Sequence, residues 1–389
     1  MDPPQVAPSH QVLTAPWHQG VAEGHGGRSL KPVALQSATE QGAAAMAVDA
    51  PAQSLGRGML ALALVGYVVC ALAGWWLALR LIPAELSVTV LGRTLHTASA
   101  HAHLNNIFLV FLLLPTVLGI EAAVVGWSKS SLRQLLFSRT PSLNTDLTVF
   151  VLGQGHVLDI VGRVLMLGAS MISGAWVHEA IRVRTGLDLG PPALPFVLQL
   201  PFYFAIYSFF DYWTHRIDHT KNFWPLHRYH HSAEDFAVVT SVRQHPAAFT
   251  AVFVVNLPLA VLGAPPDVMI YVNVLVIAIG FLVHSKIDAD WGWVGRWLIQ
   301  SPNHHRAHHK LDMTHPTGHF AVAPIWDRLF GTWYEDKPDP NLAIGVDTPY
   351  RHGVFVPRDM ARDYAHFWLG WLGRPNDGPN SDFGIFRRR

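Results

Sequence analysis

Histidines in three short runs constrain the fold of this chain more than any other feature. Of its 23 histidines, 13 lie between His215 and His319, about a quarter of the length. Residues at positions i, i+3 and i+4 share one face of an α-helix, with Cβ atoms about 5–6 Å apart. Each run therefore predicts a helix that presents a row of imidazoles. The runs read HRIDH from His215, HRYHH from His227 and HRAHH from His305.

The spacing within each run predicts how the imidazoles share metal ions. His215 and His219 can reach one ion together because they are four residues apart. In HRYHH and HRAHH, two histidines can bind one ion while the third is angled towards a neighbouring ion. Three such helices that converge could hold two ions close together. Neutral imidazole suits Zn, Cu, Fe and Ni, so the ligand type alone does not name the metal.

The composition indicates a membrane protein. Half of the residues are hydrophobic, only 14% are charged, and the mean hydropathy is +0.23. Typical soluble domains carry about 25% charged residues. The formal net charge of +1 gives no reason to expect a nucleic-acid partner. The single cysteine, Cys70, excludes an intramolecular disulfide and any zinc or iron–sulfur site built from cysteines.

The apolar runs predict about four membrane-spanning helices arranged in hairpins. Met59–Ile82 would be about 36 Å long as a helix, which is enough to cross a bilayer. Ile107–Trp127 also reaches spanning length, and its Glu121 is expected to face another helix or the interface. Pro191–Trp213 runs without a break into HRIDH, so a membrane helix should carry the first histidines just outside the bilayer. We therefore predict an all-α integral membrane protein with a histidine-rich helical cap.

The remaining histidines are expected at the same membrane face. Two shorter apolar runs, 247–262 and 268–283, predict a helical hairpin that delivers His284 there. Basic residues lie beside the histidine runs, so the positive-inside rule makes this face cytoplasmic. The membrane would be the inner membrane in a bacterium or the endoplasmic reticulum in a eukaryote. The basic residues are Arg216, Lys221, Arg228, Arg243, Lys286, Arg296, Arg306 and Lys310.

Four segments follow from these patterns. Residues 1–57 are rich in Ala, Pro, Gly, Gln and Ser and are predicted to be a disordered tail. Residues 58–146 form the N-terminal transmembrane region and a loop, 147–334 form the domain with the histidine runs, and 335–389 form a C-terminal tail. A zinc protease is disfavoured because HRIDH lacks the glutamate of HExxH. A histidine-rich metal transporter would more often place such residues in disordered loops or inside the spanning helices.

The motifs resemble the fatty acid hydroxylase/sterol desaturase superfamily of membrane di-iron enzymes, in particular its sterol-desaturase-like branch. The resemblance runs from about Leu147 to Tyr334, nearly half of the chain. It rests on HRIDH, WPLHRYHHSAEDF, RQHP, FLVHSK, SPNHHRAHH and WDRLFGTWYE, in this order. The last block, Trp326–Thr332, is interpreted as a structural lid or anchor over the metal site.

The resemblance implies that nine histidines ligate two irons and take part in catalysis. His245, in RQHP, is implied as a further metal ligand, with a hydrogen bond to a ligand as the alternative. His304 is adjacent to a matching position and is not expected to bind metal. The nine histidines are His215, His219, His227, His230, His231, His284, His305, His308 and His309.

The chain departs from the family pattern at two positions. Some hydroxylases have a histidine where this chain has Gly280, so one ion needs another ligand, for which His245 or water is the candidate. Many members read Asn-Tyr/Phe-Gly where this chain reads His319-Phe320-Ala321. His319 is therefore an extra ligand, a group beside the ligands or a substrate contact.

Carboxylates near the runs are expected to accept imidazole N–H bonds and fix the ring tautomers. Asp211, one turn before His215, and Asp218 are the first candidates, and each could equally be a solvated surface group. Further candidates are Glu234, Asp235, Asp288 and Asp312.

The implied activity is O2-dependent oxidation of an unactivated C–H bond in a lipid: an acyl chain, ether lipid, sterol, hopanoid or carotenoid. Hydroxylation is favoured over desaturation, which would use the same ligands. No flavin or nicotinamide motif is evident, so electrons would come from a separate ferredoxin or b-type cytochrome. The basic residues near the histidines would suit an acidic donor. Two alternatives remain, a zinc-dependent, non-oxidative lipid hydrolase or isomerase and a non-catalytic metal-binding member.

Overall fold

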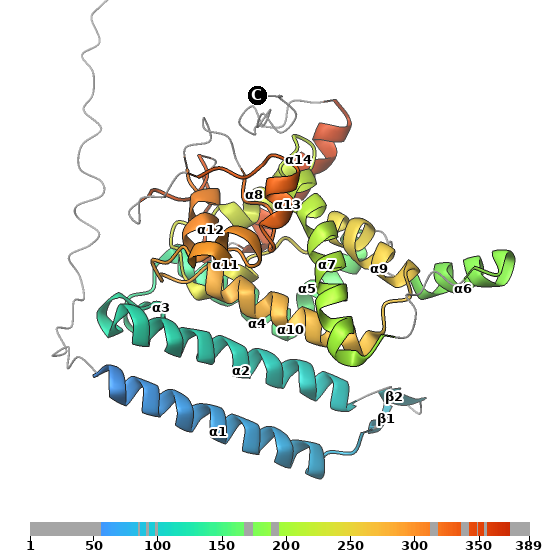
Figure 1. Cartoon of the computed structure of the whole chain (residues 1–389), viewed down its shortest axis with the longest axis horizontal. Coiled ribbons are helices and arrows are strands. Elements are labelled where there is room, and N and C mark those ends of the chain that lie inside the picture. The colour runs from blue at the N-terminus through green and yellow to red at the C-terminus, as the bar shows by residue number, and fades with distance from the viewer. Residues whose placement is uncertain are drawn as a thin grey trace, which may run out of the picture. The chain divides into compact units, whose positions relative to one another are not determined.

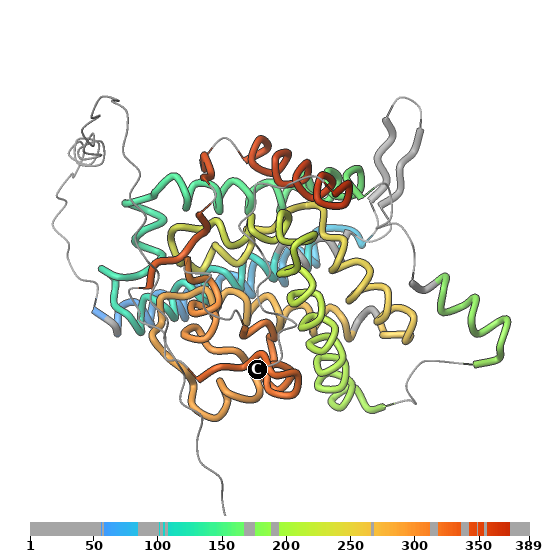
Figure 2. The backbone as a smooth tube through the Cα atoms, turned by 90° about the horizontal axis from the view of Figure 1, so that it is seen from above, coloured from blue at the N-terminus to red at the C-terminus, as the bar shows by residue number. Residues whose placement is uncertain are grey.

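The computed structural model describes most of the chain between residues 56 and 373 (Figures 1 and 2). The predicted all-α fold is confirmed, with the addition of one antiparallel hairpin of β1 (Leu86–Val90) and β2 (Arg93–Thr97). The predicted disordered tail, 1–57, lies almost wholly outside the described residues. Gaps within the described range are residues 85, 91–92, 98–99, 167–173, 188–193, 312–317, 336–341, 348 and 354–355.

Two long apolar helices form the first hairpin. α1 (Arg57–Leu81) and α2 (Ala100–Val125) lie side by side and antiparallel (Figure 1). Trp75 stacks on Phe108 with ring centroids 5.1 Å apart, and its Nε1 donates to Asn105 Oδ1 over 2.8 Å. Both helices are long and apolar enough to cross a membrane, and α1 is almost wholly exposed. A helix that is apolar all round needs a protein core or lipid around it, so α1 faces the bilayer.

The described residues contain two helices that are long and apolar enough to span a membrane, or three if one bent pair is counted as a span. The pair is α4 (Pro141–Gln154) and α5 (Val157–Leu165), which meet at 85°. The other two predicted spans form helices that are shorter or less apolar. α7 (Phe196–Asp218) carries tyrosines, Gln199 and Asp211, which lower its hydropathy, and the 247–283 hairpin contains only shorter apolar helices.

Glu121 fastens α2 to the part of the chain that carries the histidines. Its carboxylate is fully buried. Oε2 accepts the backbone N–H of Ser131 over 2.6 Å, and Oε1 accepts the Ser131 hydroxyl over 2.8 Å. Oε1 also accepts the backbone N–H of Lys286 over 2.7 Å, two residues beyond His284. The structure thus confirms that Glu121 faces other elements: it joins α2 to the start of α3 and to the turn after α10.

Replacing Glu121 by alanine is expected to destabilise the protein by about 3 kcal/mol, because buried donors on Ser131 and Lys286 lose their acceptor. Thermal unfolding of the detergent-solubilised protein would measure the loss. Glu335→Ala, which removes a largely exposed carboxylate, is the matched control. Equal melting temperatures for the two variants would contradict this role of Glu121.

The histidines lie on three helices and one helix end. α7 carries the first run, α8 (Trp224–His231) the second and α12 (Pro302–His308) the third, while His284 follows the last residue of α10 (Pro266–Val283). Proline in the first turn of α8, α10 and α12 favours a helix start there. The other elements are α3 (Ser131–Phe137), α6 (Gly174–Thr185), α9 (Leu257–Val261), α11 (Gly292–Trp297), α13 (Ile325–Leu329), η1 (Trp127–Lys129), η3 (Val238–Val242) and η4 (Ala251–Asn256).

A last helix, α14 (Val356–Trp371), packs against α8, and Figure 2 shows it in red along one side of the molecule. Arg228, inside the second histidine run, forms a fully buried ion pair with Asp363 of α14. Nε and Nη2 of Arg228 donate to Asp363 Oδ1 over 3.0 and 2.7 Å. Part of 335–389, which was predicted to be a C-terminal tail, is therefore a helix that packs against one of the helices that carry the histidines.

Candidate metal centre

Nine of the ten predicted ligands converge into two groups. Within each group, one ring nitrogen of every histidine lies within 4.8 Å of the others. The first group is His215, His219, His227, His231 and His308, and the second group is His230, His284, His305 and His309.

The division between the groups follows the helical spacing. In α8, His227 and His231 join the first group while His230 joins the second. At the end of α12 the pattern is reversed, because His305 and His309 join the second group. In both HRYHH and HRAHH, two histidines thus lie in one group and one histidine lies in the other, which agrees with the arrangement expected from their spacing.

The spacing of the Nε2 atoms fits metal coordination. Nε2 of His284 lies 3.0 Å from that of His305 and 3.4 Å from that of His230, and His309 Nε2 is 3.2 Å from His305 Nε2. Imidazole nitrogens bind zinc at about 2.0–2.1 Å, so neighbouring ligands at right or tetrahedral angles lie about 2.9–3.4 Å apart. The second group therefore has the separations of nitrogens that surround one small cation.

The hydrogen bonds that two of these rings donate also indicate a cation site. Nδ1 of His284 donates to Gly280 O over 2.7 Å and Nδ1 of His230 to Arg243 O over 3.1 Å, because a carbonyl can only accept. Burial lowers the pKa of His284 to about 4 and that of His230 well below its usual value, so both rings are neutral. Their facing Nε2 atoms then both carry lone pairs, an arrangement that a cation stabilises.

The first group is oriented in the same way. His215 Nδ1 donates to Phe320 O over 2.7 Å, and His308 Nδ1 donates to Gly318 O over 2.8 Å. In this group, His308 Nε2 lies 3.2 Å from that of His219, within the range for two ligands of one ion. Backbone carbonyls therefore fix the tautomers of four of the nine rings, and all four present Nε2 to the groups.

Aromatic side chains enclose both groups. Trp224 lies 5.1 Å from the His219 ring and 5.2 Å from the His231 ring, between ring centroids. Phe236 stacks on His284 at 5.3 Å in the second group. These walls shield the imidazoles from water, and the resulting desolvation lowers the pKa of every histidine in the two groups.

Comparison with known families identifies this part of the molecule. Residues 200–332, which include all nine histidines, match the family described as fatty acid hydroxylase. This part of the chain belongs to the fatty acid hydroxylase superfamily. The resemblance on which the sequence analysis relied is thereby confirmed.

The relatives of this segment are named for different lipids. Alkylglycerol monooxygenase from Homo sapiens is 32% identical over 41% of this chain and 35% of its own length. Ornithine lipid hydroxylase OlsE from Rhizobium tropici is 28% identical over 40% of this chain and 48% of its own. Methylsterol monooxygenase 1-3 from Arabidopsis thaliana is 25% identical over 43% and 59%. The chain thus spans about a third to three fifths of these relatives, and no solved structure matches it.

His245 departs from its prediction as a metal ligand. Its Nε2 donates to Met360 O over 3.0 Å, and its Nδ1 accepts the Ala247 N–H over 3.0 Å. It belongs to neither group, because both of its ring nitrogens are engaged. The Nε2 bond attaches the loop after η3 to α14, and the Nδ1 bond lies within that loop. The second group has four histidines without His245. At Gly280, where some hydroxylases have a histidine, an added Cβ would lie only 2.8 Å from the Ser241 hydroxyl, so a side chain there would require Ser241 to move.

His319 and His304 also lie outside both groups. Their rings are 5.0 Å apart, and the Trp333 ring lies 4.5 Å from each of them. His319 has a φ of 60°, a left-handed conformation in which Asn and His are enriched among non-glycine residues. This conformation accounts for His319 at a position where the family often has Asn.

Most of the predicted carboxylate partners do not bond to the histidines of the two groups. Asp218 approaches His227 Nδ1 at 3.9 Å, too far for a hydrogen bond, and its Oδ1 accepts the Thr250 hydroxyl over 2.7 Å. Asp211 has no hydrogen-bond partner among the described residues, and Asp312 lies outside them. Glu234 pairs with His352, and Asp235 accepts from Gln134 and Thr140, whereas Asp288 lines a surface cavity.

Three of the basic residues that were assigned to a donor surface are buried instead. Arg228 and Arg243 pair with aspartates, and Arg306 lies over the Phe236 ring. Sequence reasoning missed these roles because their partners are distant: Asp363 is 135 residues from Arg228 and Asp146 is 97 residues from Arg243. No local pattern marks such a pair.

Proposed function

We propose that this protein is a membrane-bound, O2-dependent di-iron hydroxylase that inserts one oxygen atom into a C–H bond of a lipid. The observation that carries the proposal is the convergence of nine imidazoles, seven of them buried and two half-buried, into two groups with neighbouring Nε2 atoms 3.0–3.4 Å apart. Family membership supports iron as the metal, because the named relatives are monooxygenases and hydroxylases.

Two iron ions bound there would allow O2 to be reduced by electrons from a separate donor. They would thereby supply the oxidant that attacks the C–H bond. The nine Nε2 atoms would hold these ions. Backbone carbonyls hold four of the rings in the ligating tautomer, and Trp224, Phe236 and Phe320 exclude water. Neutral rings are favoured by burial, so the groups need no deprotonation before metal enters.

A lipid substrate fits the setting of the groups. The same chain carries two apolar spanning helices, and Glu121 ties one of them to the turn that holds His284. A lipid can therefore approach from the bilayer. Alkylglycerols, ornithine lipids and methylsterols, named in the relatives, define the first substrates to test. Because all these names describe oxygen insertion, hydroxylation is favoured over desaturation.

The electron donor and the membrane side are parts of the same proposal. A ferredoxin or b-type cytochrome would approach the histidine-bearing face, which we place in the cytoplasm. Lys221 and Arg296 remain exposed on this part of the chain and would attract an acidic donor. Turnover with purified donor should then fall as the salt concentration rises, because exposed charges are screened.

The experiment that tests the function supplies 18O2 to the iron-loaded, detergent-solubilised protein. A reducing system and each of the three lipid classes are added, with His308→Ala as the inactive control. Mass spectrometry should find one 18O atom in one lipid class, only with O2 and only with the unsubstituted protein. A lipid product that forms without O2, or that carries oxygen from water, would favour the zinc-dependent alternative. A double bond without added oxygen would identify a desaturase.

A further inference from the structure

We propose that two separate buried carboxylate hubs, neither of which binds metal, position the two histidine groups independently. The hub of the second group is Asp146 with Arg243, and the hub of the first group is Asp327. This inference rests on the proposed two-metal function and concerns residues that act through the ligands.

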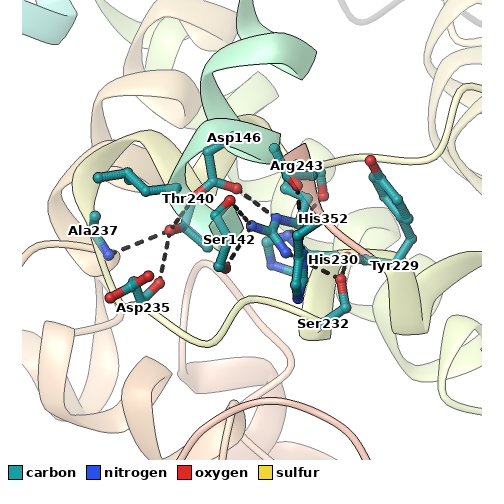
Figure 3. A network of polar contacts seen from close by, with 12 residues as sticks. Ser142, Asp146, Tyr229, His230, Ser232, Asp235, Ala237, Thr240, Arg243 and His352 are labelled. Carbon is teal, nitrogen blue, oxygen red and sulfur yellow. Dashed lines mark hydrogen bonds and ion pairs between the residues drawn. The ribbon is translucent and has the colours of Figure 1, made fainter. Parts of the chain in front are cut away.

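Arg243 is the centre of the hub for the second group (Figure 3). It is fully buried, and its Nε donates to Asp146 Oδ1 over 2.5 Å. Nη2 donates to Ser142 O over 2.6 Å and Nη1 to Ser232 Oγ over 3.1 Å. The carbonyl of the same residue accepts the Nδ1–H of His230 over 3.1 Å. The guanidinium therefore fixes the position of the acceptor that orients His230.

This hub joins three elements at one point. Asp146 and Ser142 belong to α4, Arg243 follows η3, and Ser232 caps the C-terminus of α8 directly after its histidines. The other oxygen of Asp146 accepts the Thr240 hydroxyl over 3.0 Å, so both carboxylate oxygens are engaged. His230 cannot turn relative to His284 unless these contacts yield. Asp146 also lies outside residues 200–332, so the metal-holding unit extends beyond the matched segment.

Asp327 is the hub for the first group. Its carboxylate is fully buried, with Oδ1 accepting the Phe320 N–H and Oδ2 accepting the Ala321 N–H, each over 2.9 Å. The Thr332 hydroxyl donates to Oδ1 over 2.7 Å. These bonds hold the segment whose carbonyls accept from His215, through Phe320, and from His308, through Gly318.

The two hubs are chemically independent. Among the described residues they share no residue and no hydrogen bond, and the carbonyls that they hold accept from the histidines of one group only. A carbonyl that accepts from Nδ1 fixes the tautomer and raises the basicity of Nε2, and loss of such a partner typically lowers metal affinity by about 10–100-fold. Each hub should therefore control the affinity of its own site and leave the other site unchanged.

The test is a crossed experiment on single-site proteins, with Co²⁺ as the probe and its absorption bands and bound stoichiometry as readouts. His305→Ala disables the second group and leaves the first, whereas His219→Ala disables the first and leaves the second. Asp146→Asn should lower Co²⁺ affinity about 10–100-fold in the His219→Ala protein and have no effect in the His305→Ala protein. Asp327→Asn should show the opposite pattern.

Milder variants keep the test decisive where an aspartate substitution prevents folding. Ser142→Ala removes one hydroxyl from the Arg243 hub, and Thr332→Val removes one from the Asp327 hub. They should give smaller effects with the same crossed pattern and with unchanged near-ultraviolet circular dichroism. Equal weakening of both sites by either variant, or no change at either site, would overturn independent positioning. If the unsubstituted protein binds fewer than two Co²⁺ ions, the result would instead contradict the proposed two-metal function itself.

Discussion

Replacing Asp363 by alanine is expected to destabilise the protein by about 3–5 kcal/mol, because it leaves the charge of Arg228 buried without its partner. Both side chains are fully buried, and Arg228 donates two hydrogen bonds to Asp363 Oδ1. Removal of Asp363 also frees the hydroxyl of Tyr350, which donates to Oδ2 over 2.5 Å. Since whole proteins are stable by about 5–15 kcal/mol, the loss is a large fraction of the total.

Chemical denaturation in detergent would measure this effect, and a double variant would identify its cause. Replacing both Arg228 and Asp363 by leucine removes the unpaired charge and should recover much of the lost stability, since apolar residues often replace a buried ion pair at little cost. Glu179→Ala, which breaks the exposed pair with Arg182, should leave the unfolding midpoint unchanged. A double variant as unstable as Asp363→Ala would show that packing, not charge, dominates at this site.

Replacing His305 by alanine is expected to lower the metal content from about two ions per chain to about one, because the second group then keeps only three imidazoles and lacks its central ligand. His305 Nε2 lies 3.0 Å from His284 Nε2 and 3.2 Å from His309 Nε2, so it is the shared neighbour within the second group. His219 is the shared neighbour within the first group, with its ring centroid 4.7–5.3 Å from those of the other four histidines, so His219→Ala should release the ion of that group. Elemental analysis of the purified proteins provides the measurement.

His245→Ala is the matched control for these variants. His245 is also a buried histidine of the RQHP motif, yet its two ring nitrogens bond to Met360 O and the Ala247 N–H. It should retain both ions, although the melting temperature should fall because α14 loses one of its attachments. Loss of an ion from His245→Ala would contradict the structure and restore the prediction made from sequence.

The parts of the site that sequence predicted are those with a local signature. The i, i+3 and i+4 spacing of HRYHH predicted that two of its histidines bind one ion and the third a neighbouring ion, and the structure shows that His227 and His231 are the pair. His284 was expected from the apolar run that precedes it, and α10 does end there. Long apolar runs likewise predicted α1 and α2, because length and hydropathy alone decide whether a helix can cross a bilayer.

The remaining features depend on contacts between residues far apart in sequence. His245 has the residue type and the motif of a ligand, but the position of Met360, 115 residues away, gives it another role. The expected carboxylate acceptors were replaced by backbone carbonyls, and every residue possesses a carbonyl, so no residue type reveals which one accepts. About four spans were predicted, and two or three of the described helices are long and apolar enough to cross a membrane; α7 differs from these because its tyrosines and Asp211 make it less hydrophobic.

The metal content of the purified, detergent-solubilised protein tests the central claim most directly. Protein expressed with iron should contain about two iron ions per chain, as expected for two groups of imidazoles with coordination spacing. Both His230→Ala and His308→Ala, one in each group, should lose iron. Two zinc ions that resist exchange for iron would contradict the oxygenase and favour the hydrolytic alternative, and the absence of any stoichiometric metal would contradict both.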